Sequence, residues 1–235
     1  MEMTLNVDTI NYPQRRFSNN KNQKVRNIDR LAASVGTGVG VAYSLASVTK
    51  TKPSKMLKVF KNPTKAIDVL KKLELSGMDV IKIATGSIAG GFVGGSLVDR
   101  KNTKAKAKEG IVQLIGNYII PSLFVTGGIK LNKVLNKNFK FPPKTGIVQF
   151  AFGMASLVAG VFAGNKIAKE VNKDLFQENA YRPLNWKDWS MQFDNVCLVT
   201  SVANPGTNLA KTVSKAIPVA HLIPGYLTGV KKNNG

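Results

Sequence analysis

Few side chains in this sequence are of types that do chemistry, and they are scattered. The single histidine is His221 and the single cysteine is Cys197. No carboxylate close in sequence marks His221 as an acid or base, and no basic neighbour marks Cys197 as a nucleophile. The 13 acidic residues are spread along the chain rather than clustered as metal ligands. The sequence therefore predicts no catalytic residue, no metal site and no cofactor, and we expect that the protein is not an enzyme.

Two glycine-rich runs are of the kind that can cradle a phosphate. Residues 86–95 lack the Gly-Lys-Ser/Thr ending of a P-loop. Residues 36–40 lack the third spaced glycine of a dinucleotide-binding turn, and no clear strand precedes them. Neither run predicts a nucleotide site.

Two features could serve transport through a membrane. Asp194 lies in a largely apolar stretch, and an ionisable group at membrane depth is a functional candidate. The alternative is that Asp194 lies at the membrane–water boundary near Trp189. Pro205 is the centre of an Asn-Pro-Gly sequence, which predicts either a simple loop between two helices or a broken helix of the transporter kind.

The more informative glycines are spaced four residues apart, which places them on one ridge of a helix. A ridge of small residues lets a second helix come close. Residues 86–95 contain five glycines, each worth about 1 kcal/mol against a helix in water. We expect a bilayer to enforce this helix, because lipid offers no partner for an unpaired backbone group. The predicted helix-packing residues are Gly38, Ala42, Gly86, Gly90, Gly94, Ser156, Gly160 and Gly164.

Long uncharged runs alternate with basic connectors, which predicts an all-α, multi-pass helical membrane bundle. The candidate spans are 31–48, 79–98, 110–129, 145–165 and 190–204, followed by a short bent segment at 216–230. The run at 31–48 resembles a membrane helix more than a cleaved signal, because it is rich in glycine and follows about 30 polar residues. In the third span Pro121 lacks an N–H, so a neighbouring helix must satisfy the carbonyl that it frees; Gln113 and Asn117 could bond to such neighbours.

The remaining segments are polar. Residues 1–30 are predicted to be a basic N-terminal arm, and residues 231–235 a polar tail. A basic amphipathic helix is expected to begin at an N-cap, Asn62, and to stop at Gly77, lying at the headgroups or packing on a core. Three aromatic residues before the fifth span are expected to anchor at the interface or in the core: Tyr181, Trp186 and Trp189.

The net charge of +21 is consistent with three kinds of partner: nucleic acid, anionic lipid or an acidic protein. The lysines and arginines lie between the apolar runs, a placement that favours anionic lipid headgroups over nucleic acid. Their numbers divide almost equally between the two sides of the predicted bundle, so the positive-inside rule assigns no orientation.

Three functions follow from these patterns. The first is a structural or interaction component of a membrane, expected to be a bacterial cell membrane, that self-associates as a homo-oligomer. The second is a transporter or channel for a small solute or ion. The third is a soluble basic protein that binds nucleic acid; it explains the charge, but the mean hydropathy of −0.05 is the only other support for it.

Overall fold

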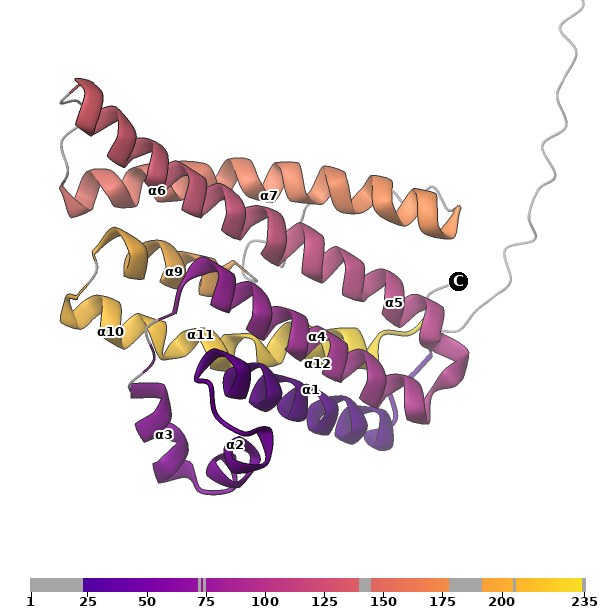
Figure 1. The fold of residues 1–235 in the computed structure, drawn as a ribbon. Helices are drawn as coiled ribbons and strands as arrows, with labels where there is room; N and C mark the ends of the chain where they lie inside the picture. The colour runs from indigo at the N-terminus through magenta and orange to yellow at the C-terminus, as the bar shows by residue number, and fades with distance from the viewer. Residues whose placement is uncertain are drawn as a thin grey trace, which may run out of the picture.

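A computed structural model describes residues 23–71, 73, 75–139, 145–177, 192–204 and 206–233. Every regular element in these ranges is a helix (Figure 1). In chain order they are α1 (Asn27–Val48), α2 (Pro53–Phe60), α3 (Pro63–Lys71), α4 (Gly77–Val98), the 3₁₀ turn η1 (Arg100–Asn102), α5 (Thr103–Ile111), the π-helical segment η2 (Val112–Ile119), α6 (Ile120–Phe139), α7 (Gly146–Phe176), α9 (Phe193–Ala203), α10 (Asn208–Ser214), α11 (Ala216–Ala220) and α12 (Leu222–Val230).

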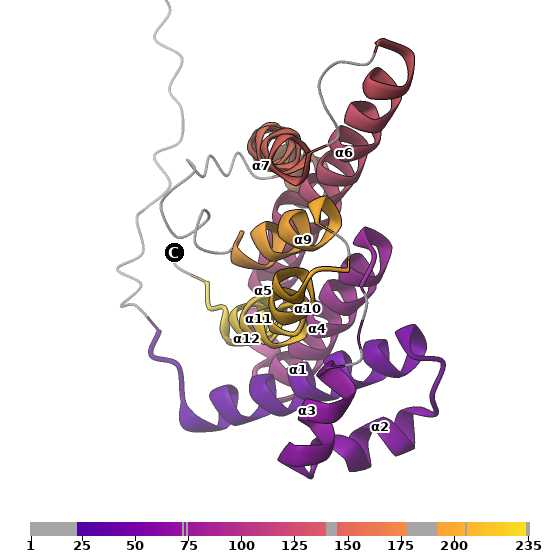
Figure 2. The same cartoon turned by 90° about the vertical axis from the view of Figure 1, so that its left-hand side faces the viewer.

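The predicted all-α class is confirmed, and four helical stretches are long and apolar enough to cross a membrane. They are Asn27–Val48, Gly77–Val98, Arg100–Phe139 and Gly146–Phe176. Figures 1 and 2 show two groups of helices, with α1, α4 and α12 in one and α6 and α7 in the other. Helix α9 lies between the groups and contacts α6, α7, α10 and α11.

Several predicted boundaries differ from the observed helices. The expected connector before the third span is itself helical, so that η1, α5, η2 and α6 follow one another as a continuous helical stretch. The fourth span continues to Phe176 instead of ending near residue 165. The fifth is the 11-residue helix α9, which is too short to cross a bilayer alone. The bent segment at 216–230 is part of a longer broken run of three short helices, α10 to α12.

The expected end of the amphipathic helix, Gly77, is instead the first residue of α4. Ser76 caps α4, because its Oγ accepts from Asp79 N at 3.3 Å while the Asp79 carboxylate accepts from Ser76 N at 3.1 Å. The segment before it forms two short helices, α2 and α3. Asn62 caps α3 as predicted, since its Oδ1 accepts from the backbone N–H groups of Thr64 and Lys65.

Helices α1 and α4 meet backbone to backbone at their glycines. A Cβ placed on any of five glycines would overlap a main-chain carbonyl of the opposite helix: Gly36, Gly40, Gly86, Gly90 and Gly94. Helix α12 approaches α4 in the same way. The closest backbone pairs are Gly36–Gly90, Gly40–Gly86, Ala32–Gly94, Gly91–Gly225 and Gly95–Gly229. The residue numbers run in opposite directions for α1 and α4 and in the same direction for α4 and α12, which sets the relative orientation of the three helices.

The other predicted packing residues have different surroundings. Gly160 faces Pro121 and Phe124 of α6, Gly164 faces Gly116 of η2, and the Ser156 side chain lies against Gly128. Ala42 is buried in the core shared by α1 and α4. Gly38 differs from these residues, because a Cβ at this position would meet no atom within 4 Å.

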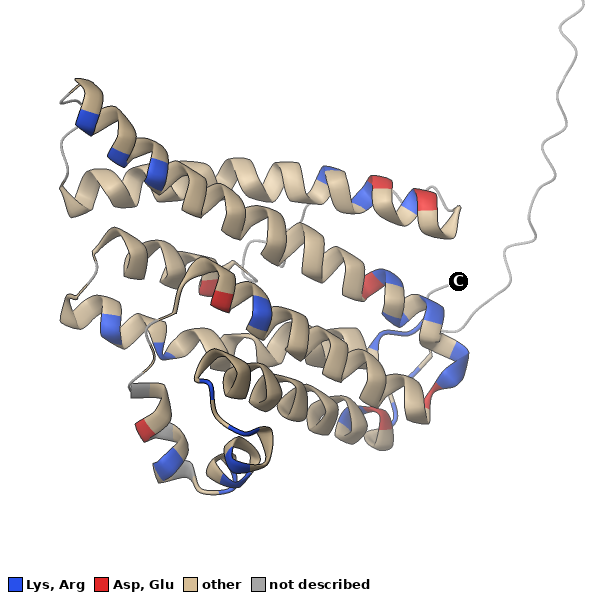
Figure 3. Ribbon diagram, viewed as in Figure 1, with Lys and Arg blue, Asp and Glu red and all other residues tan. Residues whose placement is uncertain are grey.

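The charged positions collect toward the ends of the long helices, as Figure 3 shows. Four of them form a buried group where α1 begins, α4 ends and the described chain ends. Lys232 Nζ lies 2.8 Å from Asp29 Oδ2 and 2.6 Å from Asp99 Oδ2, and Lys106 Nζ lies 2.8 Å from Asp99 Oδ2. We call these four residues the ion cluster. Its members Asp29 and Lys232 were expected in a free arm and a free tail, and both are instead part of the fold.

The two members of the ion cluster outside the long helices have shifted pKa values. Burial opposes ionisation of Asp99, but hydrogen bonds from Lys106, Lys232 and Asn102 outweigh it and lower the pKa of the carboxyl. Burial likewise opposes the charge on Lys232, and its bonds to Asp29 and Asp99 raise the pKa of the ammonium. Both shifts favour the charged pair at neutral pH.

Replacement of Gly90 by Ala tests the contact between α1 and α4. The new Cβ would overlap the Gly36 carbonyl, so the helices must separate, and we expect the free energy of unfolding to fall by about 1–3 kcal/mol. Thermal unfolding in detergent, followed by circular dichroism, measures the change. The matched control is Gly38→Ala, which should leave stability unchanged or raise it by up to about 1 kcal/mol. Equal losses in the two variants would contradict close packing at Gly90.

Replacement of Asp99 by Asn tests the ion cluster. We expect a loss of about 3–5 kcal/mol, because two buried ammonium groups lose a carboxylate partner. The control is Glu170→Gln, whose pair with Lys173 spans 4.0 Å with both side chains 54% exposed and should contribute less than about 1 kcal/mol.

The same comparison has a defined pH dependence. A lowered pKa means that the Asp99 contribution is full above the ordinary value of 3.8 and is lost as the pH falls through the lowered value. The difference in melting temperature between wild type and Asp99→Asn should therefore be constant near neutral pH and shrink in strong acid. A difference that instead grew in acid would contradict the assignment.

Candidate functional site: a buried Asp–His pair beside a file of amides

Two titratable side chains meet in the interior of the bundle. Asp194 lies in the first turn of α9, and His221 lies between α11 and α12. His221 Nε2 is 3.3 Å from Asp194 Oδ2, and their exposed fractions are 0% and 1%. Neither Asp194 carboxylate oxygen has a well-aligned hydrogen bond from the described residues. A carboxyl group in such a place is strongly disfavoured unless its partner compensates for the lost water.

The tautomer of His221 follows from its other ring nitrogen. Nδ1 lies 2.7 Å from the carbonyl oxygen of Ile217, and a carbonyl can only accept, so Nδ1 carries a hydrogen. In a neutral imidazole Nε2 then presents a lone pair to Asp194. Nε2 and the Asp194 oxygens make no aligned hydrogen bond, but at 3.3 Å an unprotonated Nε2 and a carboxylate oxygen repel each other. The contact is attractive only when one further proton resides on the carboxyl or the imidazole, which makes the pair a candidate proton-binding position.

Three elements hold His221 in place. Its ring packs against the buried ring of Tyr118 of η2, with centroids 4.8 Å apart and planes tilted by 42°. Its carbonyl oxygen accepts a hydrogen bond from Ser87 Oγ of α4. Together with the Nδ1 bond to Ile217, these contacts fix the ring and point Nε2 at α9.

A file of buried polar side chains runs from one end of the bundle toward this pair. Gln113 Nε2 donates to Glu109 Oε1 at 2.8 Å, and Asn117 Nδ2 donates to Gln113 Oε1 at 2.8 Å. The file passes to α9 through Gln192 Nε2, which donates to Asn117 Oδ1 at 3.2 Å, and Asn195 Nδ2, which donates to Gln192 Oε1 at 2.6 Å. We call these five residues the amide file. Asn195 follows Asp194 in the chain, so the file ends on the same turn of α9 that carries the carboxylate of the pair.

The other end of the amide file joins a charge. Lys231 Nζ lies 2.9 Å from Glu109 Oε2, with the lysine 41% exposed. Lys231 precedes Lys232 of the ion cluster. The file thus connects the charged end of the bundle to its interior.

Pro121 explains why α9 packs here. The missing N–H of Pro121 leaves the carbonyl of Asn117 without its helical donor. Asn195 Nδ2 donates to that carbonyl at 2.9 Å, and Ser122 Oγ donates to Asn195 Oδ1 at 3.2 Å. This confirms the expectation that a neighbouring helix satisfies the freed group. The turns before Pro121 widen into the π-helix η2, a form that often occurs at functional sites.

Of the remaining predicted site residues, some lie within the described part of the chain and others lie outside it. Asp194 is buried in the bundle, not exposed at an interface. Pro205, Tyr181, Trp186 and Trp189 lie outside the described residues. The sequence alone assigns no role to His221. The signal that could have indicated one is that the single histidine lies in an apolar segment interrupted by two prolines. Cys197 is buried one turn after Asp194.

The chemistry open to this site is proton binding. In the described ranges no three His, Cys, Asp or Glu side chains gather as a metal ion would require. Tyr118 and Cys197 are the titratable side chains near the pair, and neither is charged in its ordinary neutral-pH form. Compared with known proteins, this chain matches no family model, no curated protein and no solved structure.

Proposed function

We propose that this chain is a multi-pass membrane protein that moves protons across the bilayer, with Asp194 and His221 as its proton-binding site. The proposal depends on the 3.3 Å contact between Asp194 Oδ2 and His221 Nε2. The other ring nitrogen, Nδ1, already donates its hydrogen to the carbonyl of Ile217. Ionisable groups inside membrane proteins are rare, face the bundle interior and mark proton relays and ion pathways.

The surface of the long helices supports membrane insertion. Large apolar side chains are more than half exposed on all four candidate spans, including Val35 of α1, Leu97 of α4, Leu131 of α6 and Phe162 of α7. Exposed apolar area of this extent marks contact with lipid or with a partner. The alternative of a soluble nucleic-acid-binding protein accounts for the positive charge but not for this exposed apolar surface.

The surroundings of the pair support transport rather than a purely structural role. The amide file offers a continuous polar route from Lys231 to Asn195. His221 itself belongs to the broken run α10 to α12, which contains Pro218 and Pro224. Discontinuous helices at membrane depth are typical of transporter binding sites, because their ends can shift without unravelling a whole span.

Substitution of Asp194 by Asn tests the proposal. Asn keeps the shape but cannot hold the extra proton, so flux should fall to the level of protein-free vesicles. Proteoliposomes with an internal pH dye and an imposed potassium diffusion potential report the flux. Asp174→Asn, at an exposed position of α7, is the control and should conduct as wild type. Full flux through Asp194→Asn, or none through wild type, would overturn the assignment.

A second candidate function is assembly within the membrane, as a self-associating structural or interaction component. An apolar groove of about 600 Å³ follows the outer side of the α1–α4 contact. Its floor is made of the small residues that let the helices approach, and its rim carries exposed side chains such as Val39 and Val93. A helix from a second copy could lie in such a groove, since small residues allow close packing in lipid.

Filling this groove tests the second function. Ala89→Trp places a bulky ring on the floor of the groove, so a self-associating protein should become monomeric. Single-molecule photobleaching in supported bilayers counts the subunits. Ala159→Trp, on an exposed position of α7, should leave the count unchanged. A wild-type protein that is already monomeric would rule this function out.

A further inference from the structure

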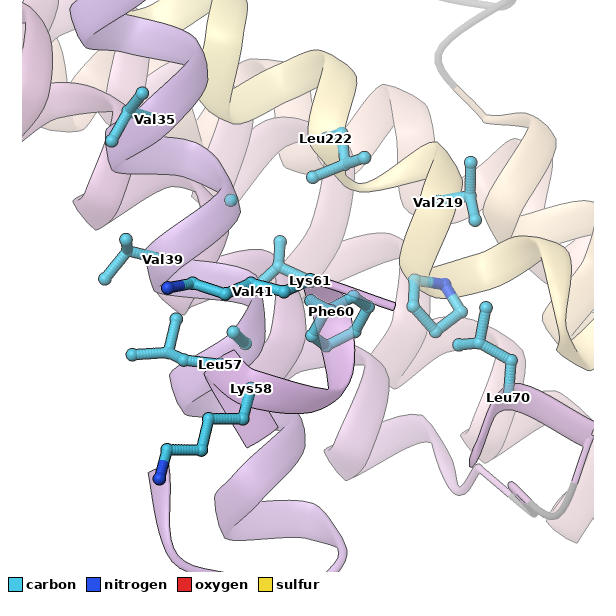
Figure 4. A pocket seen from close by; sticks show the side chains of 13 residues that line it. Val35, Val39, Val41, Leu57, Lys58, Phe60, Lys61, Leu70, Val219 and Leu222 are labelled. Carbon is cyan, nitrogen blue, oxygen red and sulfur yellow. The ribbon is translucent and has the colours of Figure 1, made fainter. Parts of the chain in front are cut away.

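A second apolar groove runs along the middle of α1, between this helix, α2 and the C-terminal helices. Its volume is about 670 Å³, within the range of roughly 300–1,000 Å³ typical of ligand pockets. Figure 4 shows Val35 and Val39 of α1 along one side, Val219 and Leu222 of the C-terminal helices along the other, and Phe60 of α2 between them. Most of these side chains are partly exposed, so the groove is open to whatever surrounds the bundle.

Two cations border this apolar groove. Lys58 and Lys61 belong to its lining. Figure 4 shows Lys61 extended across the groove toward Val39, while Lys58 points outward. Neither ammonium has an ion-pair partner among the described residues.

The sequence around these lysines carries positive charges without negative ones. Residues 49–67 contain six lysines and no acidic residue. Helix α2 begins shortly after α1 ends, and it turns Met56 into the core while its lysines face outward. A short basic amphipathic helix at the end of a membrane span lies at the depth of the lipid headgroups.

We propose that this groove binds an anionic phospholipid, with one acyl chain along Val35, Val39 and Leu222 and the phosphate at Lys61 and Lys58. The apolar lining accepts the chain of any lipid, so it supplies no preference among headgroups. The two unpaired ammonium groups supply that preference, because each favours a negative headgroup. The site is separate from the Asp194–His221 pair and does not depend on proton transport.

Native mass spectrometry of the full chain in detergent tests the charge requirement. Equimolar phosphatidylglycerol and phosphatidylcholine are added, and lipid adducts are counted. We expect at least threefold more phosphatidylglycerol bound to wild type, and equal binding of the two lipids to Lys58→Gln/Lys61→Gln. Lys133→Gln/Lys137→Gln removes the same charge from the end of α6 and should keep the preference. Equal binding to wild type, or an unchanged preference in the first variant, would overturn the proposal.

A groove-filling variant tests the chain position. Gly38 lines the groove, and a Cβ there meets no atom within 4 Å, so Gly38→Leu can occupy the groove without displacing backbone. We expect it to lose most phosphatidylglycerol adducts while keeping the wild-type melting temperature. Gly127→Leu, at an equally open position of α6, should retain the adducts.

Two further outcomes would also overturn the proposal. Palmitate that displaced phosphatidylglycerol at equal concentration would assign the groove to free fatty acids. Protein dimers that disappeared in Gly38→Leu, with lipid adducts unchanged, would assign it to a second copy of the chain.

Discussion

The close approach of glycine backbones is the constraint on which the rest of this structure depends. Helix α4 contacts α1 at one row of glycines and α12 at a neighbouring row, so one helix fixes the positions of two others. Because no side chain separates the backbones, a shift of either helix would open a gap that lipid or water could not fill well. The position of α12 in turn places His221 against Ser87 and within reach of Asp194. The meeting of Asp194 and His221 in the interior is thus a consequence of packing along helices far from Asp194 in sequence.

Charged side chains hold the ends of several helices together at one end of the bundle. Lys232 near the end of the chain bonds to Asp29 at the start of α1 and to Asp99 just after α4, and Arg26 Nη2 donates to the carbonyl of Val98 at 2.9 Å. Buried ion pairs add little net stability compared with apolar packing, but they strongly disfavour alternative arrangements in which one partner is left alone. The ion cluster therefore selects which helix ends lie together, and the glycine contacts supply the fit along their lengths.

The polar interior follows from a missing backbone hydrogen-bond donor. Pro121 frees a carbonyl inside an apolar bundle, and the side chain of Asn195 satisfies it. Asp194, the residue before Asn195 on α9, is buried in the same interior. The amide groups of the file hydrogen-bond to one another. The Asp194 carboxylate and His221 Nε2 differ from them, because neither has an aligned hydrogen bond among the described residues.

The sequence by itself determined the helical class, four of the five predicted membrane spans, the cap at Asn62 and the need to satisfy a carbonyl near Pro121. These features are local: they depend on residues within a few turns, where periodicity, length and missing N–H groups are visible. Tertiary structure alone decided that α9 is short, that Asp29 and Lys232 meet across 203 positions, and that the lone histidine faces Asp194. Such pairings depend on which helices are neighbours, and the spacing of side chains along the sequence does not specify the neighbours. The neighbours are selected by the combined fit of the glycine rows, the buried charges and Pro121.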